Sequence, residues 1–280
     1  MPKLIETMRP KHWVKNVLVL APYAFAGGNG VGVGKDGVFR LVAAFCLFCA
    51  ASSAAYAFND VMDAKADVCD PNKSGRRIGT AEAKRTALAE AVLLAALSLV
   101  GSAFIWNDGG AWIAAYLAVN AAYSIGLKEI ELIDVACVTS GFAFRMTCGC
   151  GAVGVKPGAW MLATACACAC YVSFGKRLVK KRRGNERIPN YTEEFLKQAM
   201  TASLTLTIAF HATWASSGET ADVFGWRAGV LTGTAAFALA KYHLGFTKGI
   251  SDDPTARLYK DPILAVACLA YAVCALSAAF

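Results

Sequence analysis

The chain has 280 residues, of which 56% are hydrophobic and only 17% are charged. Apolar stretches of about twenty residues recur along almost its whole length, and stretches of that length are typical of transmembrane helices. These features exclude an ordinary soluble domain, a disordered chain and a small disulfide scaffold. The formal charge of +8 is compatible with binding to an anionic membrane surface, a phosphorylated substrate or nucleic acid. The positions of the charged residues along the chain distinguish these three partners.

Nine apolar segments predict nine transmembrane helices. They cover residues 16–27, 38–58, 86–106, 111–127, 132–153, 158–175, 198–216, 225–242 and 262–279. Basic residues are strongly segregated, because 23 of the 28 Lys and Arg residues fall on the side of the N-terminus. Cytoplasmic loops carry such an excess. We therefore expect an all-α, polytopic protein of the cell (plasma) membrane, with a cytoplasmic N-terminus and no nucleic-acid partner.

The connection after the second segment carries acidic residues at helical spacing: Asn59, Asp60, Asp63 and Asp67. If the helix continues to about residue 69, its three aspartates project from one face and repel each other. Mg²⁺ makes this arrangement favourable, since it binds oxygen ligands and is commonly held by one or two carboxylates together with substrate phosphates. Three basic residues follow and suit the outer oxygens of a diphosphate: Lys73, Arg76 and Arg77. A solvated helix cap would explain any one of these residues, but not the ordered set.

A second polar set surrounds the join of the fourth and fifth segments, with Tyr123, Lys128, Asp134 and Arg145. Asp134 and Arg145 share a helix face about 16 Å apart, which places the arginine near the middle of the membrane. A charge there is costly, so its partner is either an acid on another helix or an anionic substrate group. We interpret Asp134 as a second carboxylate of the metal site.

A third set follows the sixth segment, where a strongly basic connection begins and also contains Tyr191. Lys176 and Arg177 lie nearest to the membrane surface, and we expect them to contact phosphate. The cytoplasmic connections cover about 59–85, 128–131, 176–197 and 243–261. We expect them to cap the active site of one transmembrane catalytic domain over residues 1–280, with that site facing the cytoplasm.

These residues resemble the UbiA superfamily of intramembrane prenyltransferases. The Asn-Asp-x-x-Asp-x-x-x-Asp motif of that superfamily is matched in full by residues 59–67. Residues 9–16, 123–128, 134–145, 175–177 and 259–262 are similar to its decaprenyl-phosphate phosphoribosyltransferase branch, so the resemblance covers nearly the whole chain. Asp134 stands alone in the second acidic motif, where users of prenyl diphosphates generally have two or more acids. Asp70 and Arg77 replace the family's usual His and Pro after the first motif.

The resemblance implies a nine-helix UbiA-type bundle that transfers 5-phosphoribosyl from phosphoribosyl diphosphate to a polyprenyl phosphate of the decaprenyl type, with Mg²⁺ as cofactor. The products would be polyprenyl-phosphoryl-5-phosphoribose and diphosphate, an early step toward the lipid-linked arabinose donor for cell-wall polysaccharide. The metal ligands would be Asp60, Asp63 and Asp67, and the catalytic residues Asp60, Asp63 and Asp134. The substrate-binding residues would be Lys11, Lys15, Asn16, Asn59, Lys73, Arg76, Tyr123, Lys128, Arg145, Lys176, Arg177 and Tyr191.

Two alternatives stay open. The same metal site would serve prenyl transfer from a prenyl diphosphate to an aromatic or other acceptor, and only a donor assay separates the two reactions. A transporter that uses Asp134 and Arg145 along a polar path would need no metal, and repeated halves that would favour it are not evident in the sequence. The oligomeric state is also left open, a homo-oligomer included.

Overall fold

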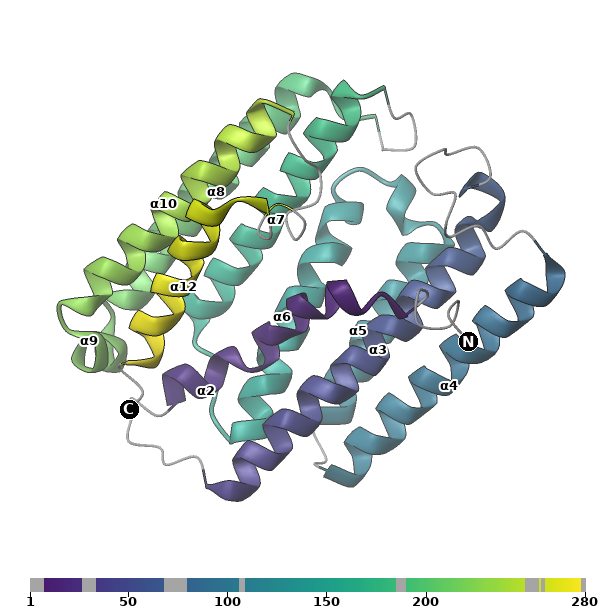
Figure 1. Ribbon diagram of the computed structural model, residues 1–280, viewed down its shortest axis with the longest axis horizontal. Helices are drawn as coiled ribbons and strands as arrows, with labels where there is room; N and C mark the ends of the chain where they lie inside the picture. The colour runs from purple at the N-terminus through teal and green to yellow at the C-terminus, as the bar shows by residue number, and fades with distance from the viewer. Residues whose placement is uncertain are drawn as a thin grey trace.

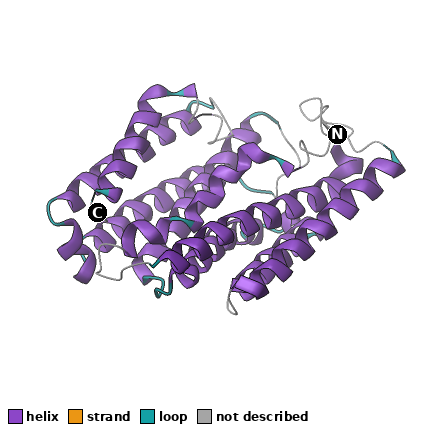
Figure 2. Ribbon diagram, turned by 60° about the horizontal axis from the view of Figure 1, so that its bottom comes forward, coloured by secondary structure: helices purple, strands orange, loops and turns teal. Residues whose placement is uncertain are grey.

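The computed structural model describes residues 8–26, 34–67, 80–105, 109–184, 190–249, 257 and 260–277, and these residues form helices and connections without a strand. In chain order the helices are η1 (Pro10–Val19), α2 (Ala21–Ala26), α3 (Lys35–Asp67), α4 (Ala81–Ile105), α5 (Gly109–Ile125), η4 (Leu127–Glu129), α6 (Ile133–Val153), α7 (Ala159–Arg182), α8 (Glu193–Ala215), α9 (Gly218–Phe224), α10 (Arg227–Thr247) and α12 (Pro262–Leu276). The long helices run side by side as one bundle (Figures 1 and 2). The all-α prediction is confirmed for this part of the chain.

Three helices in the described part of the chain are long and apolar enough to cross a membrane: the 35–64 portion of α3, the whole of α4 and the whole of α7. Large apolar side chains on α4 point away from the protein, and Leu93 and Phe104 are 70% and 87% exposed. Such a surface would be unfavourable in water but suits lipid tails. A helix is also the element that satisfies every backbone hydrogen bond within one segment, as a lipid environment requires.

The first apolar segment differs from its prediction. Instead of one helix over 16–27, the chain forms the 3₁₀ helix η1, a break at Leu20 and the short helix α2. Pro22 explains the break, because proline has no amide hydrogen with which to continue the hydrogen bonds of the preceding helix. The amides of Leu20 and Tyr23 instead donate to Val17 and Leu20, three residues earlier in each case.

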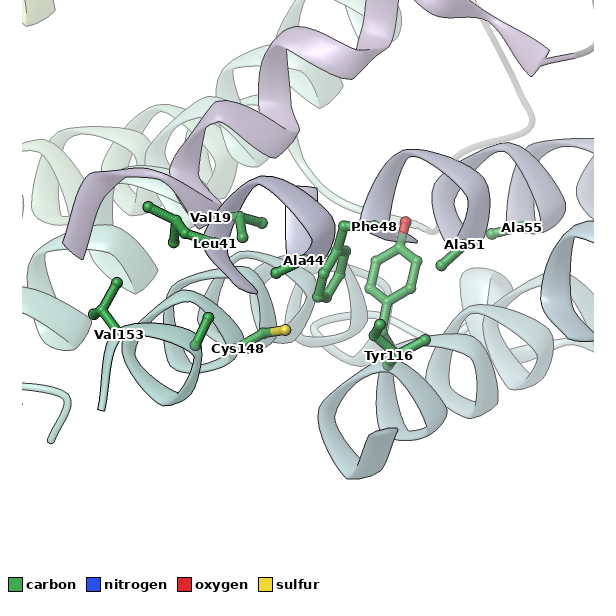
Figure 3. Packing of buried hydrophobic residues seen from close by; sticks show 11 residues of the cluster. Val19, Leu41, Ala44, Phe48, Ala51, Ala55, Tyr116, Cys148 and Val153 are labelled. Carbon is green, nitrogen blue, oxygen red and sulfur yellow. The ribbon is translucent and has the colours of Figure 1, made fainter. Parts of the chain in front are cut away.

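Two of the apolar cores in the described part of the chain position the candidate site. The first joins η1, α3, α5 and α6 around Val19, Phe48, Ile113 and Cys148 (Figure 3). The second joins α7, α8 and α10 and includes Tyr171, Leu178, Leu196, Met200 and Phe246. Because α6 also packs against α7, its N-terminal end lies between the two halves of the bundle. The candidate site is built around that end.

Helices α3 and α7 extend furthest beyond the apolar segments from which they were predicted. Helix α3 continues to Asp67 rather than ending near residue 58, and α7 continues to Arg182 rather than ending near residue 175. The first extension agrees with the expected helix through the acidic motif. Both extensions carry polar residues of the candidate site on rigid helical backbone, and a helix positions side chains more precisely than a loop does.

Candidate functional site

The extension of α3 presents the first acidic motif. Asn59 and Asp63 are one helical turn apart, and the Asn59 Nδ2 atom donates to Asp63 Oδ2 at 3.0 Å. The Ser124 hydroxyl at the end of α5 donates to Asn59 Oδ1 at 3.2 Å, which ties the motif to a second helix. The side chain of Asp67 lies outside the described residues, as do Asp70, Lys73, Arg76 and Arg77, so their predicted roles stay predictions.

Each aspartate of this motif with a described side chain forms an ion pair with a different part of the chain. Asp60 is buried and pairs with Arg9, which precedes η1 and also lies over the Tyr56 ring at 5.0 Å. Asp63 is partly exposed and pairs with Lys128 of η4. Lys128 was expected in the site, whereas Arg9 was not assigned a role. Two sequence signs of Arg9 were its place in the basic segment before the first apolar stretch and its position at the start of residues 9–16, which resemble the decaprenyl-phosphate phosphoribosyltransferase branch.

Asp134, at the start of α6, forms a second and more enclosed cluster. Its side chain is only 2% exposed. The Arg177 guanidinium of α7 pairs with Oδ2, and the Tyr191 hydroxyl donates to Oδ1 at 2.6 Å. The same hydroxyl accepts a hydrogen bond from the Leu132 backbone amide at 2.5 Å. Burial, followed by the hydrogen bond to Asp134, raises the pKa of Tyr191 to about 12, so the phenol stays protonated and donates at neutral pH.

Tyr123 lies between the two acidic clusters. This residue is in the last turn of α5, and its side chain is near enough to interact with the charges of Arg177, Asp134 and Asp63. Of the residues that the sequence predicted from three separate connections, the structure brings together Asp63, Tyr123, Lys128, Asp134, Arg177 and Tyr191. They form one polar region at the ends of α3, α5, α6 and α7.

Arg145 lies deeper in the bundle and is 4% exposed. Its guanidinium donates to Asn16 Oδ1 at 2.8 Å, to the Gly141 carbonyl at 2.8 Å and to the Tyr116 hydroxyl at 3.1 Å. Aromatic rings surround it, with the Tyr116 centroid at 4.9 Å. Within the described residues these hydrogen-bond partners are all neutral, so neither the expected acid on another helix nor an exposed anion-binding position is observed.

Asn16 shares this buried position. It is fully buried, and its amide nitrogen donates to Ser52 Oγ at 3.0 Å while its oxygen accepts from Arg145. The geometry therefore places Asn16 and Arg145 beneath the polar region, where they join η1 to α3 and α6. Lys11 is exposed, whereas Lys15 and Lys176 are partly exposed, and their roles as substrate-binding residues stay predictions.

The donor chemistry of the α3 extension fits a Mg²⁺ ion. Asp60, Asp63 and Asn59 offer carboxylate and amide oxygens from one helix end. The described residues contain no group of three or more Asp, Glu, His or Cys side chains that could hold a metal by themselves. Mg²⁺ does not need such a cage, since it is usually held by one or two carboxylates, water and substrate phosphates.

Comparison with solved structures identifies the fold. A UbiA homolog from Archaeoglobus fulgidus bound to GPP and Mg²⁺ aligns with a TM-score of 0.70 at 15% identity, over 98% of this chain and 99% of the other. The structure of a digeranylgeranylglyceryl phosphate synthase aligns with a TM-score of 0.68 at 14% identity, over 99% and 98% of the two chains. The protein has the all-helical fold of these UbiA enzymes.

Sequence comparison identifies the family. Residues 17–265 match the UbiA prenyltransferase family, and the chain belongs to it. The decaprenyl-phosphate phosphoribosyltransferase of Corynebacterium glutamicum is 31% identical over 99% of this chain and 86% of its own length. The enzyme of that name from Mycolicibacterium smegmatis is 30% identical over 96% of this chain and 89% of its own. The protein is thus a membrane transferase of the UbiA family.

Proposed function

We propose that the protein transfers the 5-phosphoribosyl group of phosphoribosyl diphosphate to a polyprenyl phosphate. The observation that carries this proposal is the meeting of Asp60 and Asp63 with basic residues from other elements at one end of an apolar bundle. That arrangement suits a metal-bound diphosphate next to a lipid. The choice of donor is supported by full-length similarity to the two relatives named above, and by Asp134 standing alone where prenyl-diphosphate users generally have more acids.

The first acidic motif would bind the leaving group. Asp60, Asp63 and Asp67 would hold Mg²⁺, which when bound supplies a Lewis acid that stabilises the departing diphosphate. Lys73 and Arg76 follow in the chain and would neutralise diphosphate oxygens that the metal does not contact. Asp134 is not assigned to the metal, because it lies at the start of another helix, α6, in a separate and more enclosed cluster with Arg177 and Tyr191.

The acceptor would be the phosphate of the lipid. One of its oxygens forms a bond to ribose C1 while the bond from C1 to the diphosphate oxygen breaks, which gives polyprenyl-phosphoryl-5-phosphoribose and free diphosphate. A lipid phosphate is anionic at neutral pH, so the step needs no general base. Lys11, Lys15 and Lys176 surround the polar region and would hold the ribose 5-phosphate or the lipid phosphate.

The membrane arrangement follows from the charge distribution. With nine spans and the basic connections inside, the polar region faces the cytoplasm of the cell membrane, where a water-soluble donor is available. The apolar bundle would hold the isoprenoid chain and open sideways to the bilayer. In such a cell the product would serve an early step toward the lipid-linked arabinose donor for cell-wall polysaccharide.

The experiment follows radiolabel from phosphoribosyl diphosphate into the organic phase, using protein purified in detergent with decaprenyl phosphate and Mg²⁺. We expect label in the lipid only when Mg²⁺ and Asp63 are both present. The matched control is Asp36→Asn, since Asp36 is exposed in the first turn of the same helix α3, at the opposite end from the motif.

The second arm replaces the donor by a radiolabelled prenyl diphosphate and offers aromatic acceptors. Label that moves only from the prenyl diphosphate would refute the phosphoribosyl donor and favour prenyl transfer at the same metal site. Full activity of Asp63→Asn in the first arm would refute the site itself.

A further inference from the structure

Asp134 differs from Asp63 of the first motif in how firmly it is held. Arg177 is buried, and its Nη1 atom also donates to the Ser173 carbonyl of its own helix at 2.9 Å. Tyr191 packs with its ring stacked on Phe195 at 5.6 Å between centroids. Both partners of Asp134 are therefore fixed by further contacts, whereas Asp63 and its partner Lys128 are each more than a fifth exposed.

The second feature is the backbone at Leu132. This residue has φ 63°, which is unfavourable for a residue with a Cβ atom, and it immediately precedes α6. A strained residue persists only where its surroundings determine its conformation. The hydrogen bond from its amide to the Tyr191 hydroxyl is one such constraint, and its side chain, which is 54% exposed, contributes little.

The turn at Leu132 is linked to the first acidic motif through Lys128, which forms an ion pair with Asp63. Lys128 lies in η4, only four residues before Leu132, and η4 packs against both α5 and α6. Leu132 immediately precedes α6, so its conformation sets the direction of the short segment that carries Lys128 to Asp63. The Tyr191 hydroxyl, which accepts from the Leu132 amide, therefore acts on the same short segment that carries Lys128.

We propose that Tyr191 is a positioning residue which, through Asp134 and the Leu132 amide, holds Lys128 at the first acidic motif, and that Asp134 anchors this contact instead of binding a metal. The proposal rests on the proposed function for its kinetic consequence only. It assigns the connection between α7 and α8 the task of ordering the connection between α5 and α6. Tyr191, expected to contact substrate, would instead act through protein groups.

The first test is hydrogen exchange in the ligand-free protein. We expect Tyr191→Phe to accelerate exchange of the Leu132 amide by about tenfold, because the substitution removes its acceptor. Tyr171→Phe is the matched control: its hydroxyl is also buried and donates to the Leu239 carbonyl at 3.1 Å, but it lies outside this cluster. Unchanged exchange at Leu132 in Tyr191→Phe would overturn the proposal, whatever reaction the protein catalyses.

The second test measures metal binding with Mn²⁺ and inorganic diphosphate by electron paramagnetic resonance. Asp134→Asn should bind as many Mn²⁺ ions as the unmodified protein, whereas Asp63→Asn should bind fewer. Loss of a Mn²⁺ ion in Asp134→Asn would show that Asp134 is a ligand and overturn its assignment. If Asp134→Asn does not fold, because Arg177 is left buried and unpaired, the positioning role is still tested by the Leu132 exchange of Tyr191→Phe, which keeps the ion pair intact.

The third test is a double-mutant cycle in the transfer assay. Tyr191→Phe and Lys128→Met should each raise the KM for the donor several-fold, and the double variant should be no worse than the more damaging single variant. A general loss of stability would give independent effects that add. Additive effects would refute the link from Tyr191 to Lys128, while absence of transfer in the unmodified protein would refute the proposed function and leave the first two tests valid.

Discussion

Gly149 offers the sharpest test of how η1 is placed over α6. A Cβ atom added at this position would lie 2.0 Å from the Val19 carbonyl oxygen and 3.2 Å from Pro22 Cγ. Backbone atoms cannot move aside as the end of a side chain can, so Gly149→Ala must push η1 away from α6. Overpacking of this kind typically costs about 1–3 kcal/mol. It opposes the gain of about 1 kcal/mol that alanine brings to a helix interior.

The assay is thermal unfolding in detergent, with Gly233→Ala as the control. Gly233 lies within α10 and has open space where its Cβ atom would be, so that substitution should give the helix gain alone. The difference between the two variants isolates the cost of the contact. At about 2–4 °C per kcal/mol for a chain of this size, we expect Gly149→Ala to melt about 2–12 °C below Gly233→Ala. Equal melting temperatures would show that η1 does not approach α6 as described.

Three further predictions concern stability and pH. Arg145→Met should lower the unfolding free energy by about 2–4 kcal/mol in a denaturation series, since it leaves buried acceptors such as Asn16 Oδ1 unpaired, and Arg145→Lys should fall in between. Leu132→Gly should melt above Leu132→Ala, because only glycine relieves the positive φ while both remove the exposed side chain. The hydrogen bond from Lys241 lowers the pKa of Asp261. This ion pair therefore stabilises the fold fully above the usual aspartate pKa of about 3.9, and its contribution is lost as the pH falls through the lowered pKa. Asp261→Asn should accordingly reduce the fall of the melting temperature at acid pH.

Hydrophobic patterning was sufficient to predict most of the fold. The second to ninth apolar segments each correspond to one long helix, because a lipid environment leaves a helix as the way to satisfy the backbone of an isolated apolar stretch. The first segment was the exception, since a proline inside an apolar stretch can either kink a helix or divide it. Here the backbone divides at Leu20, and packing against Gly149 accompanies that break.

The candidate site was predictable in its residues but not in its pairings. Helical spacing was enough to place Asp60 and Asp63 on one helix, and α3 does extend through them. Spacing carries no information about which basic residue approaches each acid from elsewhere in the chain. Arg9 was missed for that reason. Leu132 was missed because nothing in the sequence marks a leucine that adopts a positive φ.

The described charges of the site also bear on why a metal would be needed. Its three ion pairs are Asp60 with Arg9, Asp63 with Lys128 and Asp134 with Arg177. Each pair is neutral, so together they provide no net attraction for a donor that carries several negative charges. Bringing such a donor to this end of the bundle requires additional positive charge, which a divalent cation would provide together with Lys73, Arg76 and the peripheral lysines. We therefore predict that donor binding, and not only catalysis, requires Mg²⁺ at the proposed site.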